Sequence, residues 1–287
     1  MNVNIAAAQY NISFLTTWQD YCDKVTLWVE EAVRQDAKIL VFPEYASMEL
    51  ASLFEEEVYS SLSKQLEALQ ILHDDYVALY RSLAEQCQCY IQAGTFPVLI
   101  ESGAYRNRAY LFAPDGGFDY QDKLMMTRFE NEQWLIESGT ELKTFDTEYG
   151  KIGINICYDS EFPLLARQQV EAGCVLILVP TCTDTIAGYN RVKIGCQARA
   201  LENQCYVVQS SLVGDAPWSE AVDVNVGASA IYTPVDRGFP NDGIAAMGKF
   251  NAVQWVIAEL CLDGVETVRQ QGQVFNHRDW ALQTRFS

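Results

Sequence analysis

The fold is indicated first by one stretch, Gly153-Ile154-Asn155-Ile156-Cys157-Tyr158-Asp159-Ser160-Glu161-Phe162-Pro163. The apolar run over residues 151–156 predicts a buried strand, which ends on Cys157 and is followed at once by polar residues and Pro163. A strand that ends on a nucleophile at a turn before a helix holds the reactive side chain at the edge of a sheet. Free cysteine is also among the most buried residue types, so a core role is the alternative for an isolated thiol. Cys157 is therefore a candidate nucleophile that needs support from elsewhere in the chain.

Strand-like apolar runs alternate with helical segments along the chain. Strands are predicted at 3–9, 38–44, 89–100, 108–113, 151–156, 174–180, 205–210, 228–232 and 255–260. Helices are predicted at 18–34, 55–86, 162–172 and 185–203. Nearly continuous Val, Ile and Leu runs are typical of strands in largely hidden sheets. The mixture of hairpins and strand–helix–strand units predicts an α/β fold of two mixed sheets packed face to face, with helices outside.

Length and composition favour one globular unit. The chain has 287 residues, of which 49% are apolar and 20% charged, so a sizeable core is expected and general disorder is excluded. Because no linker or internal repeat interrupts it, we expect a single domain over residues 1–287, with a C-terminal tail at about 263–287. Two long loops, 213–227 and 234–248, are rich in Gly, Pro and Asp, and loops of that length are usually functional.

Charge and cysteine content exclude several classes of protein. The net charge of −18 disfavours binding to nucleic acids or anionic membranes. No apolar run is long enough to span a membrane, and the N-terminal residues lack the features of a secretory signal. The odd count of nine scattered cysteines predicts reduced thiols in a cytoplasmic compartment. The two histidines have no partner at ligand spacing, so we expect no metal and no other cofactor.

A thiol nucleophile requires a base, and histidine is poorly placed here. His73 lies in a polar helical stretch and His277 in the C-terminal tail, which disfavours a Cys–His pair. Two other strand ends carry better candidates: Glu44 directly follows a buried strand, and Lys123 adjoins an apolar segment. A carboxylate at an apolar edge can shuttle protons because burial raises its pKa. Taken singly, each has a structural alternative, a helix-capping Glu and a surface Lys.

Taken together, these residues resemble the nitrilase or carbon–nitrogen hydrolase superfamily. The resemblance rests on an apolar strand followed by Phe-Pro-Glu, a Lys shortly after a hairpin, and Gly-x-x-Ile-Cys-Tyr-Asp-x-x-Phe-Pro, in the order Glu44, Lys123, Cys157. A fourth stretch, residues 199–207, is similar to the family's late helix-to-strand segment. The resemblance extends over about residues 3–262 and is nearest to poorly characterised stand-alone branches.

The resemblance implies an α-β-β-α sandwich and a Glu–Lys–Cys triad. It assigns Cys157 as the nucleophile, Glu44 as the general base and Lys123 as the oxyanion stabiliser. The activity it implies is hydrolysis of a small, linear, non-peptide amide through a cysteine thioester. Nitrile hydrolysis, an ammonia-supplying amidase subunit of a larger complex, and a non-catalytic scaffold remain as alternatives. Family members commonly associate through their outer helices, so a homodimer or larger homo-oligomer is expected.

Many members of the superfamily carry a second glutamate after the Lys block, often followed shortly by Trp. Glu132-Gln133-Trp134 fits that pattern and leads us to Glu132, with Glu130 as the nearby competitor. The segment 127–132 lacks the histidine common in the family. Ser160 and Glu161 stand where an Arg is frequent, which leaves any substrate role of that Arg open.

Aromatic residues near these motifs are candidates for a substrate pocket. Tyr45, Trp134, Tyr158 and Trp218 could line such a pocket, since aromatic walls with few polar groups are common in ligand sites. Packing beneath a loop is the alternative for each of them.

Overall fold

The computed structural model describes residues 1–286. Its strands are β1 (Asn2–Asn11), β2 (Ala37–Phe42), β3 (Tyr90–Ala93), β4 (Phe96–Leu99), β5 (Tyr105–Phe112), β6 (Phe118–Asp122), β7 (Thr144–Thr147), β8 (Gly150–Ile154), β9 (Cys174–Thr181), β10 (Tyr206–Asp215), β11 (Val224–Asn225), β12 (Ala230–Tyr232), β13 (Ile244–Met247) and β14 (Gln254–Cys261). Its α-helices are α1 (Trp18–Arg34), α2 (Glu56–Tyr59), α3 (Leu62–Leu69), α4 (His73–Cys87), α5 (Pro163–Glu171), α6 (Ile186–Asn203), α7 (Leu262–Gln271) and α8 (Asn276–Asp279). Shorter helical turns are η1 (Ala46–Leu53), η2 (Gln70–Leu72), η3 (Glu130–Trp134), η4 (Cys157–Glu161) and η5 (Trp280–Phe286).

The strands form a large curled sheet in the order β4-β5-β3-β2-β1-β10-β9-β8-β7, centred on β1. The first part of β1 pairs with β2, and its last residues pair with β10, so β1 joins the two halves of the sheet. Ile5 and Val41 from one half share a hydrophobic core with Ile154 and Leu178 from the other. The two halves therefore pack face to face.

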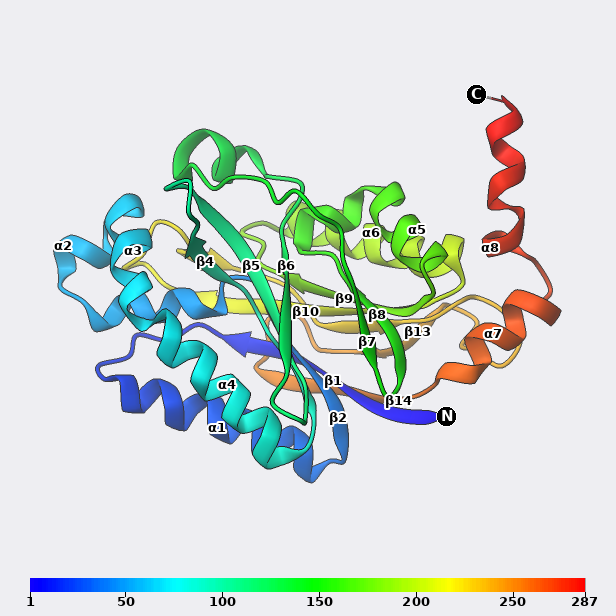
Figure 1. Ribbon diagram of the computed structural model, residues 1–287, viewed down its shortest axis with the longest axis horizontal. Helices are drawn as coiled ribbons and strands as arrows, with labels where there is room; N and C mark the ends of the chain where they lie inside the picture. The colour runs from blue at the N-terminus through cyan, green and yellow to red at the C-terminus, as the bar shows by residue number, and fades with distance from the viewer. Residues whose placement is uncertain (287) are drawn as a thin grey trace.

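Helices cover the outer surface of each half, as Figure 1 shows. Helices α1 and α4 lie over the half that contains β2 and β3, while α5 and α6 lie over β8, β9 and β10. Ala6 and Leu40 point to the opposite face from Ile5 and pack in the core beneath α1 and α4. This arrangement confirms the predicted α-β-β-α sandwich.

Helix α1 illustrates why local sequence specifies an element well. Thr17 and Asp20 form a capping box, in which Asp20 N donates to Thr17 Oγ1 at 3.1 Å and Thr17 N donates to Asp20 Oδ2 at 2.8 Å. Its buried side chains, Tyr21, Val25, Val29 and Ala32, recur every three or four residues, so one face of the helix is apolar. The bounds of this helix agree with the sequence prediction.

Other predicted elements differ from the structure. The single helix expected over 55–86 is divided into α2, α3, η2 and α4, because the chain turns at Ser60 and Ser61 and Ser61 caps α3. Strands β6, β7, β11 and β13 were not predicted, and the single strand expected over 89–100 is divided into β3 and β4. The segment expected as a tail contains α7, α8 and η5, and Figure 1 shows its last helical part standing away from the body. No helix among the described residues is long and apolar enough to cross a membrane.

The topology also determines where functional side chains can meet. Strands β2, β1, β10, β9 and β8 run parallel along the sheet, so their carboxyl ends lie at the same edge. Ligand sites in sheets of this kind lie beyond the carboxyl ends of the strands. Glu44 follows β2, Cys157 follows β8 and Cys182 follows β9, which brings these three residues to that edge.

Candidate active site

Cys157 lies at the sharp turn between β8 and η4. Its backbone is in the left-handed region, with φ of 47°, which is uncommon for a residue other than glycine and costs about 1–2 kcal/mol. Ser160 Oγ donates to Cys157 O at 2.7 Å, and Ile156 N donates to Asp159 Oδ2 at 3.0 Å, so hydrogen bonds on both sides hold the turn. The side chain is 4% exposed, and its Sγ lies 3.7 Å from Cys182 O. The turn thus aims a nearly buried thiol at the sheet edge.

Glu44 is held in place by three donors. Its Oε1 accepts from Lys123 Nζ at 2.7 Å and from Asn107 Nδ2 at 2.9 Å. Its Oε2 accepts from the backbone N–H of Cys182 at 3.1 Å. The side chain also lies close enough to the thiol of Cys157 for the two to interact. These contacts place a buried carboxylate between the ammonium and the thiol.

Lys123 follows the β5–β6 hairpin and is buried in the same cluster. Its Nζ contacts Glu44, and it also contacts Oε1 and Oε2 of Glu130 at 2.8 and 2.7 Å. The backbone holds it as well, because Lys123 N donates to Asn107 O at 2.9 Å and Gly139 N donates to Lys123 O at 2.7 Å. One buried cation is therefore shared between two buried carboxylates.

The second glutamate beside Lys123 is Glu130, and the preference for Glu132 over it disagrees with this geometry. Glu130 accepts from Tyr45 OH at 2.7 Å and from Thr127 N and Oγ1 at 2.9 and 2.8 Å. Glu132 instead forms an ion pair with Arg128 at 2.8 Å, and its side chain is 49% exposed. The π-helical turn η3 directs the two side chains to opposite sides. The sequence did contain a signal, since Thr127-x-x-Glu130 is a capping-box pattern, and Glu130 N donates to Thr127 Oγ1 at 3.3 Å.

The surroundings of Cys157 favour the neutral form of its thiol. Burial raises the pKa of Cys157 well above its usual value, Glu44 acts in the same direction, and Lys123 opposes both. Burial also raises the pKa of Glu44, against the effect of Lys123. Although burial lowers the pKa of Lys123, Glu130 and Glu44 outweigh it and raise that pKa well above its usual value. Burial tends to raise the pKa of Glu130, but Lys123 outweighs it, so the pKa is lowered. Ionisation of this thiol at neutral pH would therefore require a base.

Two further residues organise the site and were not predicted. Asn107, on β5, donates through Nδ2 to Glu44 at 2.9 Å and to Glu130 at 3.3 Å. Asp159 accepts from Leu124 N at 3.1 Å and Met125 N at 2.7 Å, which ties the segment after Lys123 to the nucleophile turn. Burial raises the pKa of Asp159 to about 7, although Lys123 and these N–H donors act in the opposite direction. Asp159 lies within the 153–163 stretch that carries the nucleophile, whereas the sequence around Asn107 contains no pattern that indicates a functional role.

A cavity of about 790 Å³ opens above the thiol. Tyr45, Trp134 and Tyr158 line it, as the sequence analysis expected, together with Glu44, Lys123, Glu130 and Cys157. Trp218 is not one of the described lining residues, because it packs edge-on against Phe14 and Tyr59 with ring centroids 5.5 and 6.2 Å away.

Among the described residues, one of the two long loops lines this cavity, and neither the other loop nor the histidines do. Loop 213–227 contributes Glu220, Ala221, Asp223 and Val224 to its wall, whereas loop 234–248 contributes none of the described lining residues. Neither His73 nor His277 lines the cavity among the described residues. Within residues 1–286 no group of three or more His, Cys, Asp or Glu side chains is placed to hold a metal ion.

Solved structures of nitrilase-superfamily proteins share this fold. Nit3 of Saccharomyces cerevisiae, a member of branch 10 of the superfamily, is 23% identical with a TM-score of 0.74, covering 94% of this chain and 93% of that one. A carbon–nitrogen hydrolase from Helicobacter pylori is 16% identical with a TM-score of 0.78, covering 94% of this chain and 92% of that one. The architecture is thus that of the nitrilase superfamily.

Sequence similarity defines the family more closely. The carbon–nitrogen hydrolase family matches residues 4–267, so the chain belongs to the carbon–nitrogen hydrolase family, which confirms the resemblance found in the sequence. The probable hydrolase YhcX of Bacillus subtilis is 36% identical over 277 residues, covering 96% of this chain. The chain spans about half of that protein, 53% of its length. The omega-amidase NIT2 of Danio rerio is 27% identical, covering 96% of this chain and 94% of that protein.

Proposed function

We propose that this protein hydrolyses the carbon–nitrogen bond of a small, linear, non-peptide amide through a thioester on Cys157. The observation that carries the proposal is the ammonium of Lys123, held by Glu44 and Glu130 beside a thiol that faces a cavity. Membership of the carbon–nitrogen hydrolase family and similarity to omega-amidases support an amide as the substrate.

Formation of the thioester requires one proton to move twice. Glu44 takes the thiol proton of Cys157, and the sulfur attacks the carbonyl carbon of the amide. Negative charge then develops on the carbonyl oxygen, where Lys123 Nζ and a backbone N–H after Cys157 are available as donors. Each preorganised donor of this kind contributes about 10²–10³-fold in rate. As the C–N bond breaks, Glu44 returns the proton to the leaving amine or ammonia.

Hydrolysis of the thioester repeats the same proton transfers with water. Glu44 removes a proton from a water molecule, the hydroxyl attacks the acyl carbon, and the proton passes to the sulfur as the carboxylic acid leaves. Glu130 does not need to contact the substrate. Glu130 compensates the charge of Lys123 and holds its ammonium in place. Thr127 and Tyr45 in turn position the Glu130 carboxylate by donating hydrogen bonds to it.

The experiment that tests the proposal replaces Cys157 with Ala and, separately, with Ser. We expect ammonia release from a panel of linear amides to fall by at least about 10³-fold in both variants, because the nucleophile is absent or much less reactive. Intact-mass detection of an acyl adduct on wild-type protein, absent from Cys157→Ala, would support the thioester directly. Undiminished turnover in either variant would contradict the mechanism.

We also propose that the protein works in a reducing, cytoplasmic compartment. All nine of its cysteines are free, including the exposed Cys261. Retention of activity in glutathione buffers at cytoplasmic potential, and loss on oxidation, would agree with this placement.

A further inference from the structure

The outer part of the cavity of Cys157 carries an excess of carboxylates. Beyond the buried cluster, the charged lining residues are Arg128, Glu132, Glu161, Asp184, Arg191, Glu220 and Asp223. They come from four separate parts of the chain, namely the segment after Lys123, the nucleophile turn, the beginning of α6 with the residues just before it, and loop 213–227. The excess is therefore a property of the cavity wall as assembled by the fold.

Both arginines of this wall are already compensated. Arg128 pairs with Glu132 at 2.8 Å, and Arg191 pairs with Glu161 at 3.6 Å. No cation of the described lining is thus left unpaired for an anionic group on a substrate.

Three carboxylates remain without an ion-pair partner among the described residues: Asp184, Glu220 and Asp223. Asp223 Oδ1 accepts from Val224 N at 2.9 Å, while the side chains of Asp184 and Glu220 form no hydrogen bond with any described residue. Carboxylates that are exposed at a cavity mouth attract cations by focusing the field into the opening.

Aromatic side chains accompany these carboxylates. Phe129, Trp134 and Tyr158 line the same cavity. Aromatic rings next to carboxylates are the usual surroundings of bound ammonium groups, because the ring faces carry negative charge density.

A second cavity gives a charged substrate arm additional room. It measures about 650 Å³ and shares Gln133, Trp134 and Glu220 with the first. Glu220 therefore borders both cavities, and Glu137 adds another carboxylate to the wall of the second.

We infer that the site takes amides that carry a positively charged amine at a distance from the bond that is cleaved. This inference rests on the proposed function, since the thiol at the base of the cavity, and not the acidic wall, defines where the ligand binds. Asp184 and Glu220 act as specificity determinants that hold the amine of the substrate, and the scissile amide lies against Cys157.

The test compares three amides of matched length: 5-aminopentanamide, pentanamide and 4-carbamoylbutanoate. We expect kcat/KM at low ionic strength to be about tenfold higher for the cationic amide than for the neutral one, and lowest for the anionic amide. The difference should lie mainly in KM and should shrink several-fold in 0.5 M salt, because exposed charges are screened.

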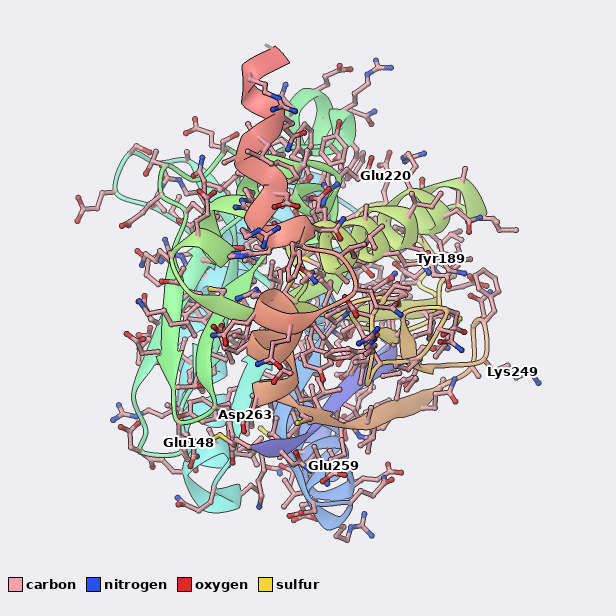
Figure 2. All side chains as sticks on the ribbon, turned by 90° about the vertical axis from the view of Figure 1, so that its right-hand side faces the viewer. Glu148, Tyr189, Glu220, Lys249, Glu259 and Asp263 are labelled. Carbon is pink, nitrogen blue, oxygen red and sulfur yellow. The ribbon has the colours of Figure 1, made fainter. Side chains whose placement is uncertain are left out.

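A matched pair of double variants separates the local effect from net charge. Asp184→Asn with Glu220→Gln should reduce the preference for the cationic amide to about threefold or less. The control, Glu148→Gln with Glu259→Gln, removes the same charge far from the cavity and should retain the preference. Figure 2 shows Glu220 toward one end of the molecule and Glu148 and Glu259 toward the other.

The outcomes distinguish this inference from the proposed function. Equal kcat/KM for all three amides, or a preference for the anionic one, would overturn the inference while leaving amide hydrolysis intact. Loss of the preference in the control double variant would overturn it too, since the effect would then follow net charge alone. If no amide is hydrolysed, or if Cys157→Ala retains activity, the proposed function itself fails.

Discussion

Two glutamates only two residues apart have different surroundings in this protein. Glu130 is 2% exposed and in contact with Lys123, whereas Glu132 lies at the surface and contacts Arg128. A buried cation that loses one of its anionic partners is left with an uncompensated charge, which typically costs about 3–5 kcal/mol. A surface ion pair contributes at most about 1 kcal/mol. Loss of the Glu130 carboxylate should therefore cost much more free energy than loss of the Glu132 carboxylate.

We predict that Glu130→Gln lowers kcat by about 100-fold or more, and that Glu132→Gln changes it by less than about threefold. Initial rates of ammonia release on one amide test this, with urea unfolding midpoints measured alongside to confirm that both variants are folded. A larger loss in Glu132→Gln than in Glu130→Gln would restore the assignment first drawn from the sequence pattern.

At the scale of elements, the site depends on a link between two turns. Asp159 belongs to η4 and accepts hydrogen bonds from Leu124 and Met125, which directly follow Lys123. These hydrogen bonds tie the nucleophile turn to the Lys123 segment, although Leu124 and Cys157 are 33 positions apart in the sequence. Such a link between loops preserves the spacing of side chains that act together.

The buried carboxyl of Asp159 should make stability depend on pH. Its pKa is raised from 3.8 to about 7 by burial, so between these values the folded protein holds a proton that the unfolded chain has released. The contribution of Asp159 to stability is therefore full below about pH 4, falls as pH rises toward 7, and is constant above it, with a slope of about 1.4 kcal/mol per pH unit at most.

We predict that Asp159→Asn, which cannot ionise, removes this component of the pH dependence. The free energy of unfolding, measured in urea between pH 5 and pH 8, should fall more steeply with pH in the wild type than in the variant. Parallel curves for the two proteins would show that Asp159 is ionised throughout, held by its three N–H donors. The variant's lower overall stability does not affect this comparison of slopes.

At the scale of the whole molecule, one outer helix layer carries an apolar surface. On α6, Ile186, Ile194 and Leu201 recur at intervals that place them on one side of the helix, and Leu164 of α5 is also exposed. Exposed apolar side chains that share one side of a helix are typical of an interface between protein chains. We therefore propose that the protein forms a homodimer or larger assembly through the α5–α6 layer.

We predict that light scattering gives a mass of at least twice the chain mass of 32.3 kDa, and that Ile194→Glu reduces it. Leu27→Glu on α1 is the matched control, because Leu27 is 62% exposed and Ile194 65% exposed, but they lie in opposite helix layers. A monomeric wild type, or equal dissociation in both variants, would contradict the proposed interface.

Local patterns in the sequence predicted most of the elements and the order of the motifs. Apolar periodicity located α1, β2, β8 and β9. Each of these elements buries apolar side chains that recur along its own sequence with the period of a helix or a strand. The same local reasoning placed Glu44, Lys123 and Cys157 at the ends of strands. This local reasoning was wrong for residues 55–86, for which it predicted one helix although the N-cap Ser61 divides the stretch.

Which side chains meet in the site depends on how elements that are distant in the sequence pack together. It brought Glu130 rather than Glu132 to Lys123, added Asn107 from another strand, and placed Trp218 against Phe14 away from the cavity. It also gathered Asp184, Glu220 and Asp223 from distant loops around one opening. Periodicity indicates which face of an element is buried, but it does not indicate the partner of a buried charge, because that partner comes from another element.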